Sequence, residues 1–158
     1  MIHSPFTLDW PDADATAACA IALGAELRAG DTILLCGSVG AGKTHFARAL
    51  IQSILDVVED VPSPTFTLVQ TYDTAHGALW HTDLYRIQSE GEVDELGLLD
   101  AFEDAICLVE WPDRLGTLAP QNALSLTITP NGDGRTARLE WSDPRWTNRL
   151  ASAVHHHA

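Results

Sequence analysis

Residues 37–44 read Gly-Ser-Val-Gly-Ala-Gly-Lys-Thr and match the phosphate-binding pattern G-x-x-x-x-G-K-[ST]. Glycines let such a loop curl so that its backbone N–H groups face phosphate oxygens, and the start of the following helix adds partial positive charge. The lysine would bind the β- and γ-phosphates, and the threonine hydroxyl would ligate Mg²⁺. The pattern predicts a site for a nucleoside triphosphate with Mg²⁺, the alternative being a glycine-rich turn that only caps a helix.

Lys43 is the only lysine in the chain, and the other eight basic side chains are arginines. A compact ammonium charge is poorly replaced by the planar guanidinium of arginine, so a single lysine at this position supports phosphate binding. The guanine-reading motif N-K-x-D would need a second lysine. We therefore expect ATP and ADP, rather than guanine nucleotides, as ligands.

A phosphate loop also needs an acidic partner for Mg²⁺, usually at the end of a neighbouring apolar strand. Glu110 ends one apolar run, and Asp83 lies in a second candidate strand that also contains His81. Spacing leaves open which carboxylate contacts the metal, and either could be a solvated strand end. His81 could be a zinc ligand, but no further ligands are spaced to join it.

Thr65 lies in the segment Pro-Ser-Pro-Thr-Phe-Thr at residues 62–67, between the phosphate loop and Asp83. Proline restricts both itself and the preceding residue to extended backbone, so the segment should be stiff. A threonine in such a loop can sense the γ-phosphate, as switch threonines do. The equally simple alternative is a proline-rich entry into a strand.

The elements that must position these residues alternate between strands and helices. Apolar runs and turn signals predict strands at 6–8, 32–36, 65–72, 78–85, 105–109, 124–129 and 136–141. Helical spacing predicts helices at 12–27 and 43–55 and helical turns at 91–102, with a helical or loose tail after 144. These predict one α/β domain over residues 1–158, a P-loop NTPase-like three-layer fold with a mixed, mainly parallel sheet flanked by helices.

Composition limits the partners and the compartment. The chain has 158 residues, 46% of them hydrophobic, and a net charge of −13, so it should not clamp a nucleic-acid backbone by itself. Cys19, Cys36 and Cys107 are scattered and should be buried free thiols in a reducing compartment. The N-terminal region has no lysine or arginine before Arg28, and no apolar run could span a bilayer, so we expect a cytoplasmic protein.

Taken together, residues from about 23 to 138 resemble the TsaE (YjeE) family, the small ATPase of bacterial tRNA threonylcarbamoyladenosine synthesis. The phosphate loop matches the family's G-x-L-G-A-G-K-T, with Val39 in place of the usual leucine and His45 in place of a common threonine or serine. Four further motifs follow in the family's order: Ser-Pro-Thr-Phe at 63–66, His-Thr-Asp-Leu-Tyr-Arg at 81–86, Glu-Leu-Gly at 95–97 and Glu-Trp-Pro-Asp-Arg at 110–114.

The resemblance implies roles for individual residues. Thr44 and Glu110 would hold Mg²⁺, Asp83 would be needed for hydrolysis, Thr65 would act as a switch, and Trp111 would lie near the nucleotide. The predicted catalytic residues are Lys43, Thr65 and Asp83. The predicted nucleotide-binding residues are Ser38, Val39, Gly40, Ala41, Gly42, Lys43, Thr44, His45 and Trp111.

The resemblance also implies TsaD and TsaB as protein partners, with tRNA reached only through their complex. The expected activity is ATP hydrolysis that is weak alone and depends on partners. A small-molecule kinase is one alternative, although Arg86 and Arg114 are few arginines for a lid that excludes water. A nucleotide-dependent interaction module that does not hydrolyse ATP is the other.

Overall fold

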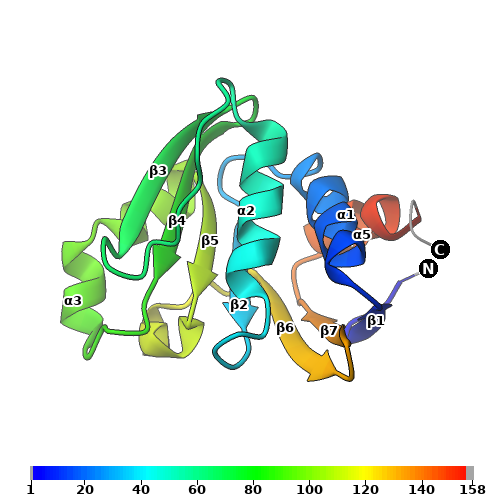
Figure 1. Ribbon diagram of the computed structural model, residues 1–158. Helices are drawn as coiled ribbons and strands as arrows, with labels where there is room; N and C mark the ends of the chain where they lie inside the picture. Colours follow the sequence, from blue (N-terminus) through cyan, green and yellow to red (C-terminus); the bar gives the residue numbers. More distant parts are fainter. Residues whose placement is uncertain (1, 156–158) are drawn as a thin grey trace.

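The structure is a computed structural model that describes residues 2–155, and all seven of its strands belong to one sheet (Figure 1). The strands are β1 (Phe6–Trp10), β2 (Thr32–Cys36), β3 (Val69–Thr74), β4 (Gly77–Asp83), β5 (Ile106–Glu110), β6 (Leu124–Asn131) and β7 (Gly134–Glu140). Their order across the sheet is β1-β7-β6-β2-β5-β4-β3. The strand that precedes the phosphate loop, β2, is therefore central.

The sheet is parallel at its centre and antiparallel at both edges. β6, β2, β5 and β4 run parallel to one another, whereas β1 and β7 at one edge and β3 at the other pair antiparallel with their neighbours. Parallel neighbours need long crossover connections, and the helices supply them. The predicted mixed α/β sheet flanked by helices is confirmed, and its parallel pairings lie in the four central strands.

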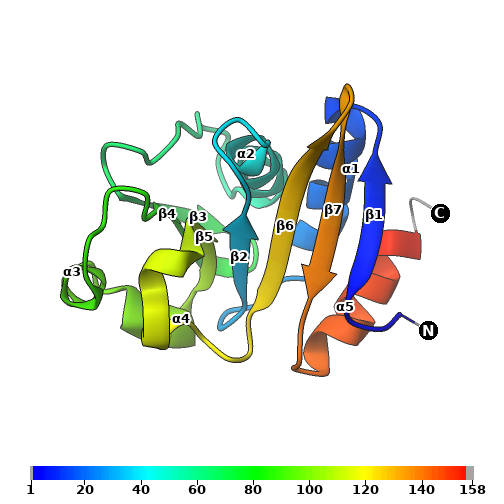
Figure 2. The same cartoon turned by 90° about the horizontal axis from the view of Figure 1, so that it is seen from below.

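Helices cover both faces of the sheet (Figure 2). One face carries α1 (Ala13–Gly24), α2 (Lys43–Ile54) and α5 (Arg145–His155), and the other carries α3 (Glu90–Glu95), α4 (Leu98–Asp104) and the 3-10 helix η1 (Pro112–Leu118). Within the described residues, none of these helices is long and apolar enough to cross a bilayer.

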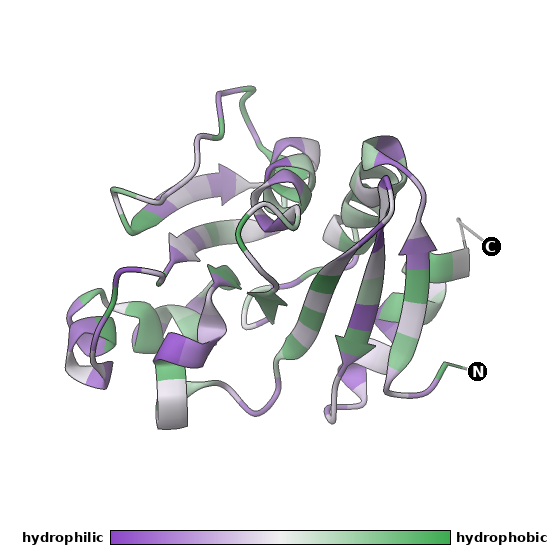
Figure 3. Ribbon diagram, turned by 60° about the horizontal axis from the view of Figure 1, so that its bottom comes forward, coloured by the Kyte–Doolittle hydropathy of each residue, from purple (hydrophilic) through white to green (hydrophobic). Residues whose placement is uncertain are grey.

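The strands show why the core has two halves. In β2, Ile33 and Leu35 pack into the cluster under α1 and α2, and Leu34 packs into the cluster on the opposite face. A strand covered on both faces must be apolar throughout, as this one nearly is. In Figure 3, hydrophobic (green) residues alternate with nearly neutral (pale) ones along β6, and buried and half-buried positions alternate over the first residues of this strand.

Most of the predicted elements are present in the structure. The strand predicted at 32–36 is β2, and the helices predicted at 12–27 and 43–55 are α1 and α2. The tail after residue 144 forms α5, whose last residue is His155, and His156 and His157 lie outside the described residues.

The strand predicted at 65–72 is wrong in its first half, because β3 begins only at Val69. Leu68 has a φ of 68°, and its N–H donates to the carbonyl of Pro64 over 2.7 Å. A left-handed backbone is unusual for a bulky side chain, and it turns the chain instead of extending it. This turn lets residues 65–68 fold back over the end of β4.

The three cysteines are free thiols, but they are not all buried as predicted. Cys19 and Cys107 are buried, and burial raises the pKa of Cys19 to about 11 and that of Cys107 to about 12. Cys36 is only half-buried, because it is the last residue of β2, where the chain leaves the sheet.

Asp31 anchors α5 to the start of β2. Its carboxylate is 1% exposed, accepts the Arg28 backbone N–H over 2.7 Å, and pairs with Arg145 and Arg149 over 3.2 Å each. The neighbouring Trp146 is fully buried, and its indole N–H donates to the Asn122 carbonyl over 2.8 Å. The carboxylate thus accepts hydrogen bonds from the Arg28 amide and from Arg145 and forms an ion pair with Arg149, and its loss would leave these groups without their partner.

We predict that Asp31→Ala lowers the free energy of unfolding by about 2–3 kcal/mol, because it removes the acceptor of the Arg28 amide and the ion-pair partner of two partly buried arginines, Arg145 and Arg149. Urea unfolding of the full chain measures this change. The matched control is Glu140→Ala, which breaks a half-exposed ion pair with Arg138 and should cost less than about 1 kcal/mol. Equal effects of the two substitutions would show that Asp31 does not anchor α5.

Candidate functional site

The predicted phosphate loop spans residues 37–42, between the end of β2 and the first residue of α2. Gly42 has a φ of 112°, and a Cβ atom at this position would point into open space. Gly37 is needed for a different reason, since a Cβ there would lie 2.6 Å from the Ile128 carbonyl oxygen of β6. The loop therefore keeps an open side for a ligand while its base presses against the sheet.

Lys43 is held inward, with 5% of its surface exposed. Its ammonium donates to the Gly37 carbonyl over 2.5 Å and lies 3.5 Å from the centre of the Trp111 ring. Burial lowers the pKa of Lys43, and the nearby carboxylates of Glu110 and Asp83 act in the opposite direction. One carbonyl and one aromatic ring thus hold the Lys43 ammonium against the loop, close to the side of the loop that is open to a ligand.

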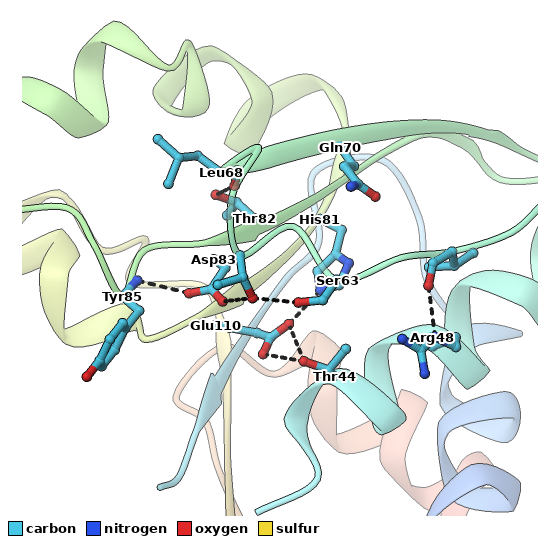
Figure 4. A network of polar contacts seen from close by, with 12 residues as sticks. Thr44, Arg48, Ser63, Leu68, Gln70, His81, Thr82, Asp83, Tyr85 and Glu110 are labelled. Carbon is cyan, nitrogen blue, oxygen red and sulfur yellow. Dashed lines mark hydrogen bonds and ion pairs between the residues drawn. The ribbon is translucent and has the colours of Figure 1, made fainter. Parts of the chain in front are cut away.

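Glu110 comes to the loop because β5 lies beside β2, with Leu35 opposite Glu110 in the parallel register. The carboxylate is 2% exposed. It accepts the Thr44 hydroxyl over 2.9 Å at Oε1 and 3.2 Å at Oε2, and His81 Nε2 lies 2.7 Å from Oε2 (Figure 4). The threonine of the loop motif and the glutamate at the strand end therefore meet.

Asp83 ends β4 and lies opposite Glu110 in the register of the next strand pair. Its Oδ1 accepts the Tyr85 backbone N–H over 2.9 Å, and its Oδ2 accepts the Thr65 hydroxyl over 3.3 Å. The Ser63 and Thr65 hydroxyls are 2.7 Å apart, so the turn after Pro64 is tied to the carboxylate. The sequence motif around Thr65 thus meets the one that contains Asp83.

A cavity of about 390 Å³ opens between these groups. Its lining comprises Val39, Gly40, Gly42, Lys43, Thr44, His45, Thr65, Asp83, Tyr85, Glu110 and Trp111. All three predicted catalytic residues, both predicted metal ligands and Trp111 share this one cavity. Ser38 and Ala41 do not line it, since Ala41 is fully buried in the core.

Two residues at the site were not predicted. Tyr85 lines the cavity with its ring centre 4.8 Å from that of Trp111, and only its place in the motif at 81–86 could have indicated it. Arg135 donates through Nε to the Ala41 carbonyl over 2.8 Å and so supports the phosphate loop from β7. Nothing in the sequence around Arg135 signals this contact, which depends on the pairing of β7 with β6.

The donor set suits Mg²⁺ better than zinc. Among residues 2–155, no three His, Cys, Asp or Glu side chains are arranged to hold a metal by themselves. Mg²⁺ prefers oxygen ligands and is usually bound through one or two protein groups together with substrate phosphates. The adjoining oxygens of Thr44 and Glu110, next to a phosphate loop, have this chemistry.

A family model and individual relatives of known sequence point to the same protein family. The model of the family "Threonylcarbamoyl adenosine biosynthesis protein TsaE" matches residues 10–138. A TsaE protein of Rickettsia bellii is 37% identical over 107 residues, which are 68% of this chain and 74% of that protein. A TsaE protein of Rickettsia felis is 41% identical over 91 residues, 58% of this chain and about half (53%) of that protein.

A solved structure agrees with these sequence matches. The crystal structure of Bacillus subtilis YdiB superimposes with a TM-score of 0.75 and 25% identity, over 99% of this chain and all of that one. The family model alone covers well over half of the chain. Five motifs resemble TsaE in the sequence, and three of them, at 37–44, 81–86 and 110–114, supply most of the cavity. The chain belongs to the TsaE family of threonylcarbamoyl adenosine biosynthesis proteins.

Proposed function

We propose that this chain binds ATP with Mg²⁺ and hydrolyses ATP within the tRNA threonylcarbamoyladenosine machinery, together with TsaD and TsaB homologues. The observation that supports this most is the contact of Thr44, at the start of α2, with Glu110, at the end of β5. It brings a hydroxyl and a carboxylate side by side at the open side of a phosphate loop. Ligands of open α/β sheets bind at this edge, outside the carboxyl ends of the strands.

Lys43 would change partners when the nucleotide binds. Its contacts with the Gly37 carbonyl and the Trp111 ring hold a cation without any phosphate, and a phosphate oxygen is a stronger acceptor than either. The backbone N–H groups of the loop and the start of α2 would bind the remaining phosphate oxygens. Mg²⁺, held by Thr44 and Glu110, would neutralise charge that develops on the phosphates.

Asp83 would act on water rather than bind the metal directly. Glu110 contacts Thr44, whereas Asp83 accepts hydrogen bonds from Tyr85 and Thr65 one strand further away. A carboxylate of this kind can orient the attacking water or support the metal's own ligands. Thr65 would report on the γ-phosphate through its hydroxyl contact with Asp83, so that nucleotide state changes the turn that follows Pro64.

The negative charge of the chain supports the proposal that its partners, and not this chain, bind the tRNA. A net charge of −13 opposes direct binding of an RNA backbone, so the partner proteins would make the tRNA contacts. We expect weak hydrolysis by the chain alone, because among the described residues no arginine lines the cavity to neutralise the transition state. A partner could supply that charge or order the turn at Thr65. We expect the complex to work in the cytoplasm.

The first prediction concerns phosphate release from ATP–Mg²⁺ by the full chain, alone and with the TsaB and TsaD homologues of its own organism. Wild type should be slow alone and faster with the partners. Lys43→Ala should reduce the stimulated rate on the order of 100-fold, because it removes the ammonium group that would bind the phosphates. Asp83→Asn should reduce it about 100-fold or more while ATP affinity changes little, because its role is in the chemical step.

The matched control is Asp100→Asn, which makes the same change at an exposed position on α4 and should leave the rate unaltered. If wild type with partners releases no more phosphate than Lys43→Ala, hydrolysis is contradicted. A nucleotide-gated interaction module would then explain an intact site better.

The second prediction uses Trp111 as a reporter of the nucleotide. Withdrawal of the Lys43 ammonium from its ring should change the tryptophan emission when ATP–Mg²⁺ is added. Fluorescence titration should show the change in wild type and in Trp141→Phe, and it should be lost in Trp111→Phe. ATP affinity of Trp111→Phe, measured by calorimetry, should stay within about fivefold of wild type. If the emission of wild type does not change when ATP–Mg²⁺ is added, or if Trp111→Phe keeps the whole change, the proposed movement of Lys43 away from the Trp111 ring is contradicted.

A further inference from the structure

His81 lies in the interior of the sheet and has no surface exposed. It is in β4, two residues before Asp83, and on the same face of the sheet as Glu110. Its Nε2 lies 2.7 Å from Glu110 Oε2, while Thr44 approaches the same carboxylate with distances of 2.9 Å to Oε1 and 3.2 Å to Oε2 (Figure 4). The carboxylate is therefore contacted from two sides.

The two ring nitrogens of His81 differ in their surroundings. Within the described residues, Nδ1 is buried and has no hydrogen-bond partner, whereas Nε2 faces a carboxylate. A proton on Nδ1 would be a buried donor without an acceptor, and a proton on Nε2 can be donated to Glu110. The geometry thus favours the tautomer of His81 that carries its proton on Nε2 over the one that carries it on Nδ1.

The strand register explains why the contact needs a side chain of this length. In the parallel pairing of β4 with β5, Asp83 lies opposite Glu110 and His81 lies opposite Leu108. His81 therefore reaches Glu110 along the diagonal of the strand pair and contacts Oε2, whereas the shorter contact of Thr44 is to Oε1. A donor at this position can fix the carboxylate and leave Oε1 to the side chain of Thr44.

We propose that His81 is a positioning residue: it donates from Nε2 to Glu110 and holds that carboxylate in the orientation in which it and Thr44 bind Mg²⁺ of the nucleotide. This inference rests on the proposed function, because it assigns the metal to Thr44 and Glu110. Carboxylates that ligate metals are commonly oriented by a second hydrogen bond, and loss of such a bond typically costs 10–100-fold in metal affinity or activity.

The test is calorimetric ATP binding to the full chain, once with Mg²⁺ and once with EDTA. His81→Leu removes the donor, and His81→Gln keeps an N–H near the position of Nε2. The Leu variant should lose about 10–100-fold in affinity with Mg²⁺ and little with EDTA. The Gln variant should stay near wild type in both. His76→Leu, in the turn between β3 and β4, is the matched control and should change neither affinity.

A second measurement needs no variant. Long-range ¹H–¹⁵N NMR of wild type should show a proton on Nε2 of His81, and the Nε2 signal should shift when ATP–Mg²⁺ is added. A His81 ring that is protonated only on Nδ1 cannot donate to Glu110 and would overturn the proposal even if the Leu variant failed to fold.

The outcomes separate this inference from the proposed function. A parallel loss of affinity with and without Mg²⁺ in the Leu variant, or no loss at all, would overturn the positioning role alone. A wild-type chain whose ATP binding does not depend on Mg²⁺ would overturn the proposed metal site and the role of His81 together.

Discussion

The hydrogen bond between Thr44 and Glu110 joins two segments 66 residues apart, and the candidate site depends on it. It requires that β5 lie beside β2 in a parallel register, so that a strand ending in glutamate finishes over the first turn of α2. That register in turn needs crossover connections and helices on both faces of the sheet. The antiparallel edges, β1 with β7 and β3 with β4, complete the sheet around this parallel centre. The fold can thus be understood as the means of bringing one hydroxyl and one carboxylate together at a glycine-rich loop.

The charged side chains of the site are buried, so each of them needs partners within the protein. Lys43, Asp83 and Glu110 are 5%, 6% and 2% exposed, and each charged group has to be satisfied by its neighbours. Lys43 has a carbonyl and an aromatic ring, Asp83 has a hydroxyl and a backbone amide, and Glu110 has Thr44 and His81. Two carboxylates facing one lysine suit a divalent cation, whereas the loop's backbone amides suit phosphate. A nucleotide with its metal would replace the contacts of Lys43 and the contact between Thr44 and Glu110, whereas the contact between His81 and Glu110 would remain.

Much of this arrangement was predictable from the sequence, for identifiable physical reasons. The strand at 32–36 is apolar throughout because both faces are covered, and the motif at 37–44 carries its own chemistry. Both candidate carboxylates, Asp83 and Glu110, proved to lie at the site, although spacing alone could not decide which meets Thr44. The left-handed Leu68 and the support of the loop by Arg135 escaped prediction. The Leu68 carbonyl accepts the Asp83 N–H and the Thr82 hydroxyl from β4, and Arg135 contacts a residue 94 positions away, so neither feature leaves a local pattern of hydrophobicity or turn residues.

A double-mutant cycle tests most directly whether Thr44 and Glu110 act on one metal ion. Calorimetry would give the affinity for ATP–Mg²⁺ of wild type, Thr44→Val, Glu110→Gln and the double variant. If the two side chains share a metal, the double variant should bind about as weakly as the weaker single variant, because either change already disrupts the site. Additive losses, as expected for independent contacts, would contradict a shared metal and with it the account of how this fold forms its site.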